Sequence, residues 1–225
     1  MAERSGVFDM IGPVMIGPSS SHTGGVVRIG RVANRIFGGM PDEATITFYN
    51  SFARTYEGHG SNRAVLAGLM DFKTDDKRIK EALTLATEAG MNYHFRSIGS
   101  ASTYHPNTVR IEMKRGNHTA EVLGESRGGG VIRIKEVNGF DANFTASLHT
   151  LIFEADDVPG SISFITDVLS RDGCNIATMT VSRESKAGRA CLILEMDSSL
   201  QDLTLQYLSN LSWVRKVINL PDIDK

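Results

Sequence analysis

The chain has 225 residues, a formal net charge of −2, 41% hydrophobic residues and 22% charged residues. This composition is ordinary for a globular protein, and the length allows one large domain or two small ones. Without an excess of basic charge, nothing favours nucleic acid or anionic lipid as a partner. No apolar run approaches the roughly 20 residues of a membrane helix, and the first residues lack a signal peptide's apolar segment. We therefore expect a cytoplasmic protein.

The first half of the chain mixes helical and extended patterns. Apolar spacing predicts helices at 26–37, 63–72 and 75–90, and strands at 44–51, 92–98, 107–113, 119–126 and 130–137. The helix at 75–90 has the clearest apolar stripe, with Asp75 or Asp76 as its cap and Gly90 at its end. The segment 52–62 is expected to be a loop.

The second half has a different organisation. Residues 141–147 are small and polar, which is typical of a linker. After them the pattern predicts, in order, a strand at 150–156, a helix at 160–173, strands at 175–184 and 189–197, a helix at 200–211 and a strand at 214–220. This βαββαβ order predicts a ferredoxin-like unit. We expect an α+β protein with one domain at 1–147 and a second at 148–225.

The most distinctive motif is GPSSSHTGG (17–25), which surrounds His22 with hydroxyl groups just before the first predicted helix. Hydroxyl donors and free backbone N–H groups at a helix start form an anion site that suits a carboxylate or a phosphate. His22 can act as an acid or a base near neutral pH. An ordinary Ser/Thr cap beside a surface histidine explains the same residues. A phosphate loop is disfavoured, because no lysine follows the glycines.

Two further motifs carry a histidine. His59 lies between two glycines in EGHGSNRA, where a backbone could approach a ligand closely, although any tight loop also needs glycines. His105 precedes Pro106 and Asn107, a pattern that also occurs in a plain turn before a strand. A zinc site made of the three histidines is an alternative on ligand count, but HExxH and CxxC spacings are absent, so no metal ligand is predicted.

A candidate anion site in the second half is the strand–loop–helix junction at 156–160. Pro159 suits the first helical turn, and Gly160 leaves backbone N–H groups open to an amino-acid carboxylate. The alternative is a plain helix start in a domain that dimerises.

Taken together, these motifs resemble a known family. The segments MIGPSSSHTGG, GHGSNRA, HPNT and GGGVI resemble the β subunit of bacterial iron–sulfur-dependent L-serine dehydratase. The segments DVPGSI, GCNIATMTVSRE and RACLILEMD are similar to an ACT domain, an amino-acid-sensing module with the ferredoxin-like fold. The resemblance covers essentially the whole chain. The first half also resembles a substrate- or effector-binding domain of some phosphoglycerate dehydrogenases.

The resemblance implies an activity and a partner. L-Serine would lose water and then ammonia to give pyruvate, with a [4Fe–4S] cluster acting as a Lewis acid on the substrate hydroxyl. The cluster cysteines belong to the α subunit in this family. The only two cysteines of this chain, Cys174 and Cys191, agree with that expectation, because a cluster normally takes about four thiolates. The chain would then need the α subunit for activity.

The resemblance also implies roles for individual residues. The substrate pocket would be lined by His22, His59, His105 and Asn107, and the substrate carboxylate would be held by Ser19, Ser20, Ser21 and Thr23. Either His22 or His59 would be the general base. Asn62 stands where the family pattern GHGTD has an acid, so a role for that acid is in doubt while His59 is retained.

In the ACT-like half the resemblance implies a regulatory role. The effector would be bound by Asp157, Pro159, Gly160, Asn175 and Ile176, and two copies of this half would form a homodimer. The competing function is a regulatory module without catalytic residues, as in the phosphoglycerate dehydrogenases.

Overall fold

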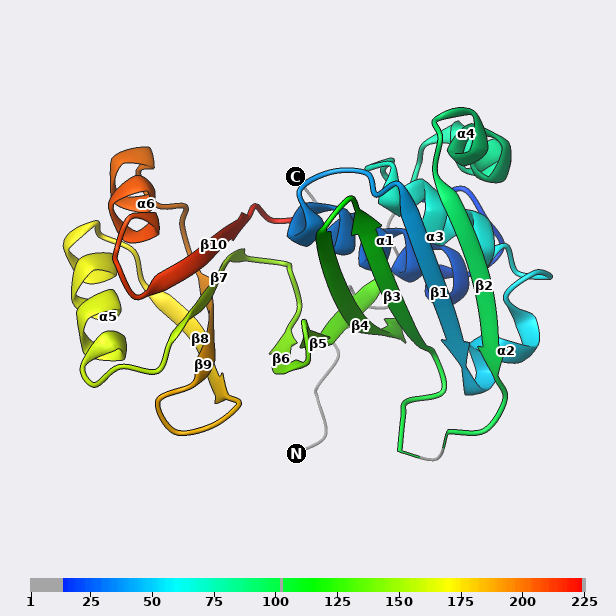
Figure 1. Cartoon of the computed structure of the whole chain (residues 1–225). Helices are drawn as coiled ribbons and strands as arrows, with labels where there is room; N and C mark the ends of the chain where they lie inside the picture. Colours follow the sequence, from blue (N-terminus) through cyan, green and yellow to red (C-terminus); the bar gives the residue numbers. More distant parts are fainter. Residues whose placement is uncertain (1–13, 102, 224–225) are drawn as a thin grey trace. The chain divides into compact units, whose positions relative to one another are not determined.

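The computed structural model describes residues 14–101 and 103–223. The chain divides into two compact units at the bond between Asn138 and Gly139 (Figure 1). Mixed helices and strands make up both units, which confirms the expected α+β class. No helix in the described part of the chain combines the length and the apolar character that crossing a membrane requires.

The first sheet has the strand order β2-β1-β3-β4-β5-β6. Its strands are β1 (Glu43–Tyr49), β2 (Asn92–Ile98), β3 (Thr108–Arg115), β4 (His118–Gly128), β5 (Val131–Val137) and β6 (Phe140–Phe144). The helical segments are η2 (Ser20–Gly24), α1 (Gly25–Phe37), α2 (Asn50–Thr55), α3 (Ser61–Leu69), η3 (Lys77–Glu81) and α4 (Ala82–Glu88). Strand β1 runs parallel to β2 and antiparallel to β3.

Two glycines let α1 and α3 pack backbone to backbone. A Cβ atom on Gly68 would lie 2.3 Å from the carbonyl oxygen of Val27, and one on Gly30 would lie 2.6 Å from that of Val65. Both distances are far below a normal van der Waals contact. The opposite side of α1 packs on the sheet, where Ile29 occupies the space above Gly124 of β4. Helix α1 is therefore buried on nearly every side.

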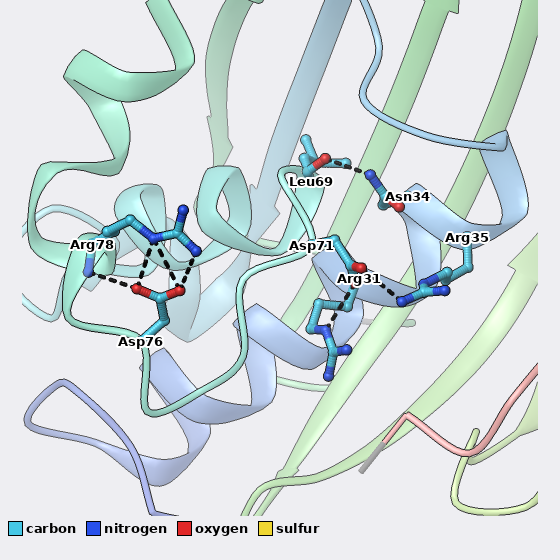
Figure 2. A network of polar contacts seen from close by, with 7 residues as sticks. All are labelled: Arg31, Asn34, Arg35, Leu69, Asp71, Asp76 and Arg78. Atoms are coloured by element: carbon cyan, nitrogen blue, oxygen red, sulfur yellow. Dashed lines mark hydrogen bonds and ion pairs between the residues drawn. The ribbon is translucent and has the colours of Figure 1, made fainter. Parts of the chain in front are cut away.

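Polar contacts fix the far end of this helix pair. Figure 2 shows Arg31 and Arg35 of α1 reaching Asp71, with N···O distances of 3.1 and 2.6 Å. The Asn34 amide donates to the carbonyl oxygen of Leu69 at 2.7 Å. The end of α3 is therefore held against α1 by three side chains of α1.

The second unit has the predicted ferredoxin-like order. It consists of β7 (His149–Asp156), α5 (Ser161–Arg171), β8 (Ile176–Arg183), β9 (Arg189–Met196), α6 (Asp202–Ser209) and β10 (Val214–Leu220). The antiparallel sheet has the order β10-β7-β9-β8. Apolar residues of both helices and of the central strands share one core, which includes Leu151, Phe153, Ile165, Leu169, Leu194 and Leu208.

Two expectations for the first unit were wrong in part. The predicted loop at 52–62 begins instead within the helix α2. Asn50 opens this helix with φ of 52°, which asparagine tolerates better than most residues, and its side chain bonds the backbone at 101 and 104. The predicted helix at 75–90 is broken into η3 and α4 at Glu81, whose φ and ψ are −108° and 11°. As expected, Asp76 caps η3 through the Arg78 N–H group.

The predicted linker at 141–147 was also wrong in part, because its first residues belong to β6. Phe140, Ala142 and Phe144 are buried while the residues between them are exposed, which is the alternation of a half-buried strand. Asn138 and Gly139 both have positive φ, 52° and 82°, as a type I′ hairpin turn requires. Both signals are present in the sequence.

We expect Glu195→Ala to lower the free energy of unfolding by at least about 2 kcal/mol, because it removes a buried carboxylate that accepts three hydrogen bonds. Glu195 is only 4% exposed, and its carboxylate accepts from the Thr145 N–H, the Thr145 hydroxyl and the Thr178 hydroxyl at 2.8–2.9 Å. Urea unfolding followed by circular dichroism measures the loss. Glu184→Ala, at an exposed residue of the same unit, is the matched control and should change little. Equal midpoints for the two variants would refute a stabilising role of Glu195.

Candidate functional site

The first histidine motif forms the start of α1, as expected. Ser19 is the cap residue, and its hydroxyl accepts a hydrogen bond from the His22 N–H at 3.1 Å. The next five residues, Ser20–Gly24, form a π-helical turn, and the Gly25 N–H donates to the Ser20 carbonyl. Such turns are rare and often occur at functional sites.

Serine hydroxyls hold the His22 ring from one side. Ser21 Oγ lies 3.0 Å from His22 Nδ1, Ser19 Oγ lies 3.4 Å from the same atom, and the two hydroxyl oxygens are 3.3 Å apart. The other ring nitrogen, Nε2, is buried and has no hydrogen-bond partner among the described residues. Two hydroxyls of the predicted carboxylate cradle therefore orient His22.

The second motif interlocks with the first. The rings of His22 and His59 meet edge to face, with centroids 4.8 Å apart. The Thr23 hydroxyl donates to the His59 carbonyl at 3.2 Å, and the Ser61 hydroxyl donates to the His22 carbonyl at 2.7 Å. Two segments that are 36 to 39 residues apart in sequence are thus joined by a reciprocal pair of hydrogen bonds.

The third motif reaches the same region through α2. The Pro106 carbonyl accepts hydrogen bonds from the backbone N–H groups of Ser51 and Phe52 at 2.9 and 3.4 Å. The Phe52 ring in turn lies edge to face with His22 at a centroid distance of 4.9 Å. His105 Nδ1 accepts from the Asn107 N–H at 3.1 Å. The structure therefore brings the rings of His22 and His59 into contact, while the segment of His105 and Asn107 is linked to His22 through Phe52.

A pocket of about 310 Å³ lies beside the first two motifs. Thr23 and His59 line it together with two cationic side chains, Arg63 and Lys80, which the sequence did not single out. Arg63 immediately follows the GHGSN motif in the sequence, and this position could have indicated that it belongs to the site. Lys80 comes from η3 and has no such signal. Glu57 also lines the pocket, so the lining carries two cationic groups and one carboxylate, and the remaining positive charge favours an anionic ligand such as a carboxylate.

Two histidines, His22 and His105, are biased toward the neutral form. Burial, and then the neighbouring His59, hold the pKa of His22 below its ordinary value. Burial also lowers the pKa of His105, with a further decrease from the Arg127 guanidinium that Glu125 opposes. Neutral imidazoles can accept a proton at neutral pH, which a general base requires.

The lowered pKa of His22 predicts an acid-dependent loss of stability. The unfolded chain takes up the proton near pH 6.5, whereas the folded chain takes it up only at a lower pH, so the folded state loses stability as the pH falls below about 6.5. Urea midpoints at pH 7.5 and 5.5 should show a smaller difference for His22→Gln than for the wild type. His94→Gln, at an exposed histidine of β2, should keep the wild-type difference. An unchanged difference in His22→Gln would contradict the assignment.

The residues expected to bind an effector have partners within the second unit. Asp157 accepts from the Ala187 N–H and from Arg183 at 3.1 and 3.0 Å, and the Asn175 amide donates to Asp197 at 2.7 Å. Gly160 has φ of 84° just before α5, Pro159 precedes it, and Ile176 begins β8. A pocket of about 680 Å³ in this unit lies between α5 and α6, where it is lined by Phe164, Asp167, Val168, Arg171, Asp172, Leu203, Thr204 and Tyr207.

The cysteines of this chain do not fit an iron–sulfur cluster. Cys174 and Cys191 are free and buried, and burial, with Glu154 nearby, raises the pKa of Cys191 to about 12, so its thiol keeps its proton. Over residues 14–101 and 103–223, no group of three or more His, Cys, Asp or Glu side chains could hold a metal ion.

Comparison with known proteins agrees with these motifs. The model of the family "Serine dehydratase beta chain" matches residues 6–137. The chain is 41% identical over 216 residues to a probable L-serine dehydratase beta chain from Bacillus subtilis, covering 96% of this chain and 98% of that protein. It is 35% identical over 196 residues to an L-serine dehydratase beta chain from Peptoniphilus asaccharolyticus, covering 87% and 88%.

The chain also resembles part of a larger enzyme. D-3-phosphoglycerate dehydrogenase from Bacillus subtilis is 28% identical over 163 residues, which cover 71% of this chain but 31% of that enzyme. The two beta chains, by contrast, are covered over 98% and 88% of their own length. The chain therefore belongs to the serine dehydratase beta chain family.

Proposed function

We propose that this chain is the β subunit of an L-serine dehydratase and that, with an α subunit, it converts L-serine to pyruvate and ammonia. The observation that carries the proposal is the interlocked pair His22 and His59, which lies beside the 310 Å³ pocket in the part of the chain that matches the family. The relatives' designation as beta chains supports the need for a partner subunit.

The reaction needs a base at the substrate α-carbon. When the α-proton and the β-hydroxyl leave, L-serine becomes aminoacrylate and water, and the tautomeric imine then takes up water and releases ammonia to give pyruvate. We assign the proton acceptor to His59, because its flanking glycines let the substrate approach the ring. His22, whose Nδ1 is held by serine hydroxyls, orients the substrate through Nε2.

We propose that the [4Fe–4S] cluster is held by the α subunit. The two buried thiols of this chain are too few, and Cys191 keeps its proton. A cytoplasmic location is proposed for the assembly. It is supported by the two free cysteines, since cytoplasmic thiols stay reduced.

The chain purified alone and without oxygen should be colourless and inactive, whereas the complex with the α subunit should form pyruvate from L-serine. Iron analysis, the visible spectrum and an anaerobic pyruvate assay on both preparations measure this. Iron–sulfur absorbance in the lone chain would refute the assignment of the cluster. An inactive but fully loaded complex would instead favour a regulatory module, the function suggested by the similarity to phosphoglycerate dehydrogenase.

We propose that residues 1–147 form the domain that carries the site and that residues 148–225 form an ACT domain whose edge pairs with a second copy. Strand β8 is an edge strand of its sheet, and Met179 and Val181 on it are 47% and 46% exposed. An exposed apolar edge strand favours pairing with another chain. The effector residues proposed from the family pattern are Asp157, Pro159, Gly160, Asn175 and Ile176.

A further inference from the structure

Ser126 of β4 has a buried hydroxyl that the fold does not use. The residue is 0% exposed, and its Oγ has no hydrogen-bond partner among the residues that the structure describes. A buried hydroxyl without a partner is costly, so such a group in a native protein calls for an explanation, of which a bound molecule or a catalytic role is one.

Ser126 lies next to the segment that carries His22. A Cβ atom on Gly25 would lie 2.1 Å from Ser126 Oγ, so the hydroxyl rests on the first turn of α1, directly after the turn that carries His22. The backbone of Ser126 is paired with Asn107, because its N–H donates to the Asn107 carbonyl at 3.0 Å and its carbonyl accepts from the Asn107 amide at 3.4 Å. Ser126 therefore joins the first and third motifs.

Four other hydroxyls of this region already have partners. Ser19 and Ser21 bond the His22 ring, Thr23 donates to the His59 carbonyl, and Ser61 donates to the His22 carbonyl. Ser126 Oγ is left with both its donor and its acceptor capacity, and His22 Nε2 is a second buried polar atom without a partner among the described residues. The site therefore holds two unused polar atoms on segments that touch each other.

We propose that Ser126 is a further substrate-binding residue, whose hydroxyl donates a hydrogen bond to the carboxylate of the amino-acid substrate. The assignment rests on the proposed L-serine dehydratase function. It shifts the carboxylate contact from Ser21 and Thr23, whose hydroxyls bond the His22 ring and the His59 carbonyl, to the fully buried hydroxyl of Ser126, which has no partner among the described residues.

The test is Ser126→Ala in the complete α–β complex. Losing a hydrogen bond to a charged group weakens binding by a factor of about 10–100. We expect the KM for L-serine to rise by that factor while kcat stays within about threefold, since the lost contact binds substrate and transition state alike. Because the hydroxyl has no partner among the described residues, the urea midpoint without substrate should stay the same or rise.

Thr150→Val is the matched control, because it removes another fully buried hydroxyl, one that does have a partner, at Leu148 in the second unit. It should lower the urea midpoint and leave KM and kcat unchanged, the opposite pattern to Ser126→Ala. An unchanged KM in Ser126→Ala, or a loss of stability as large as that of Thr150→Val, overturns the assignment while wild-type turnover still upholds the proposed function. A wild-type complex that does not turn over L-serine overturns both.

Discussion

His59→Ala is expected to lower the kcat of the α–β complex for L-serine by about 10²–10⁴, the usual effect of losing a general base. His59 lines the 310 Å³ pocket and contacts the His22 ring, so it is placed to accept a proton from a bound substrate. His22→Ala should raise KM more than it lowers kcat, because that ring orients the substrate rather than taking its proton. Steady-state pyruvate formation measures both constants.

The control for this pair is His94→Ala, which removes an exposed histidine on β2 and should leave both constants unchanged. Circular dichroism melting is the fold control, and the free energy of unfolding of His59→Ala should change by less than about 1 kcal/mol, as for surface substitutions. Wild-type kcat/KM in both site variants, with normal pairing to the α subunit, would show that neither histidine takes part. A lower kcat in His22→Ala and a higher KM in His59→Ala would exchange their roles.

Gly68→Ala should be among the most destabilising single changes in the first unit, with a loss of about 3 kcal/mol or more. The added methyl would lie 2.3 Å from the Val27 carbonyl and 2.7 Å from the Gly30 Cα, and both are backbone atoms that cannot move without separating the helices. Because His22 precedes α1 and His59 precedes α3, such a separation also pulls the two histidines apart. We therefore expect turnover to fall even in the folded fraction.

Gly99→Ala is the matched control, because a methyl at Gly99 meets nothing within 4 Å and its φ lies in the ordinary range. Urea unfolding and the L-serine assay on both variants give the comparison. If Gly68→Ala is as stable as Gly99→Ala, the close contact of α1 with α3 is not required by the fold. If it is unstable but turns over at the wild-type rate per folded molecule, the helix contact does not set the geometry of the site.

The local sequence pattern was sufficient to predict those parts of the structure that depend on residues close together in the chain. The order of strands and helices in the second unit follows from apolar periodicity and from glycines at the helix ends, and the structure has the same order. The capped turn around His22 follows from Ser19 and the helix behind it. The strand β6 was equally readable, since the Asn138-Gly139 turn and the alternating residues after it are local signals.

The sequence by itself determined the α+β class, the ferredoxin-like second unit and the chemical character of three histidine motifs. Only the tertiary structure decided that His22 and His59 touch, that Arg63 and Lys80 share their pocket and that Ser126 rests on Gly25. The physical reason is that these contacts join residues far apart in the chain. They depend on the close approach of two helices at Gly30 and Gly68 and on the register of β4 beside β3, and no local propensity encodes either one.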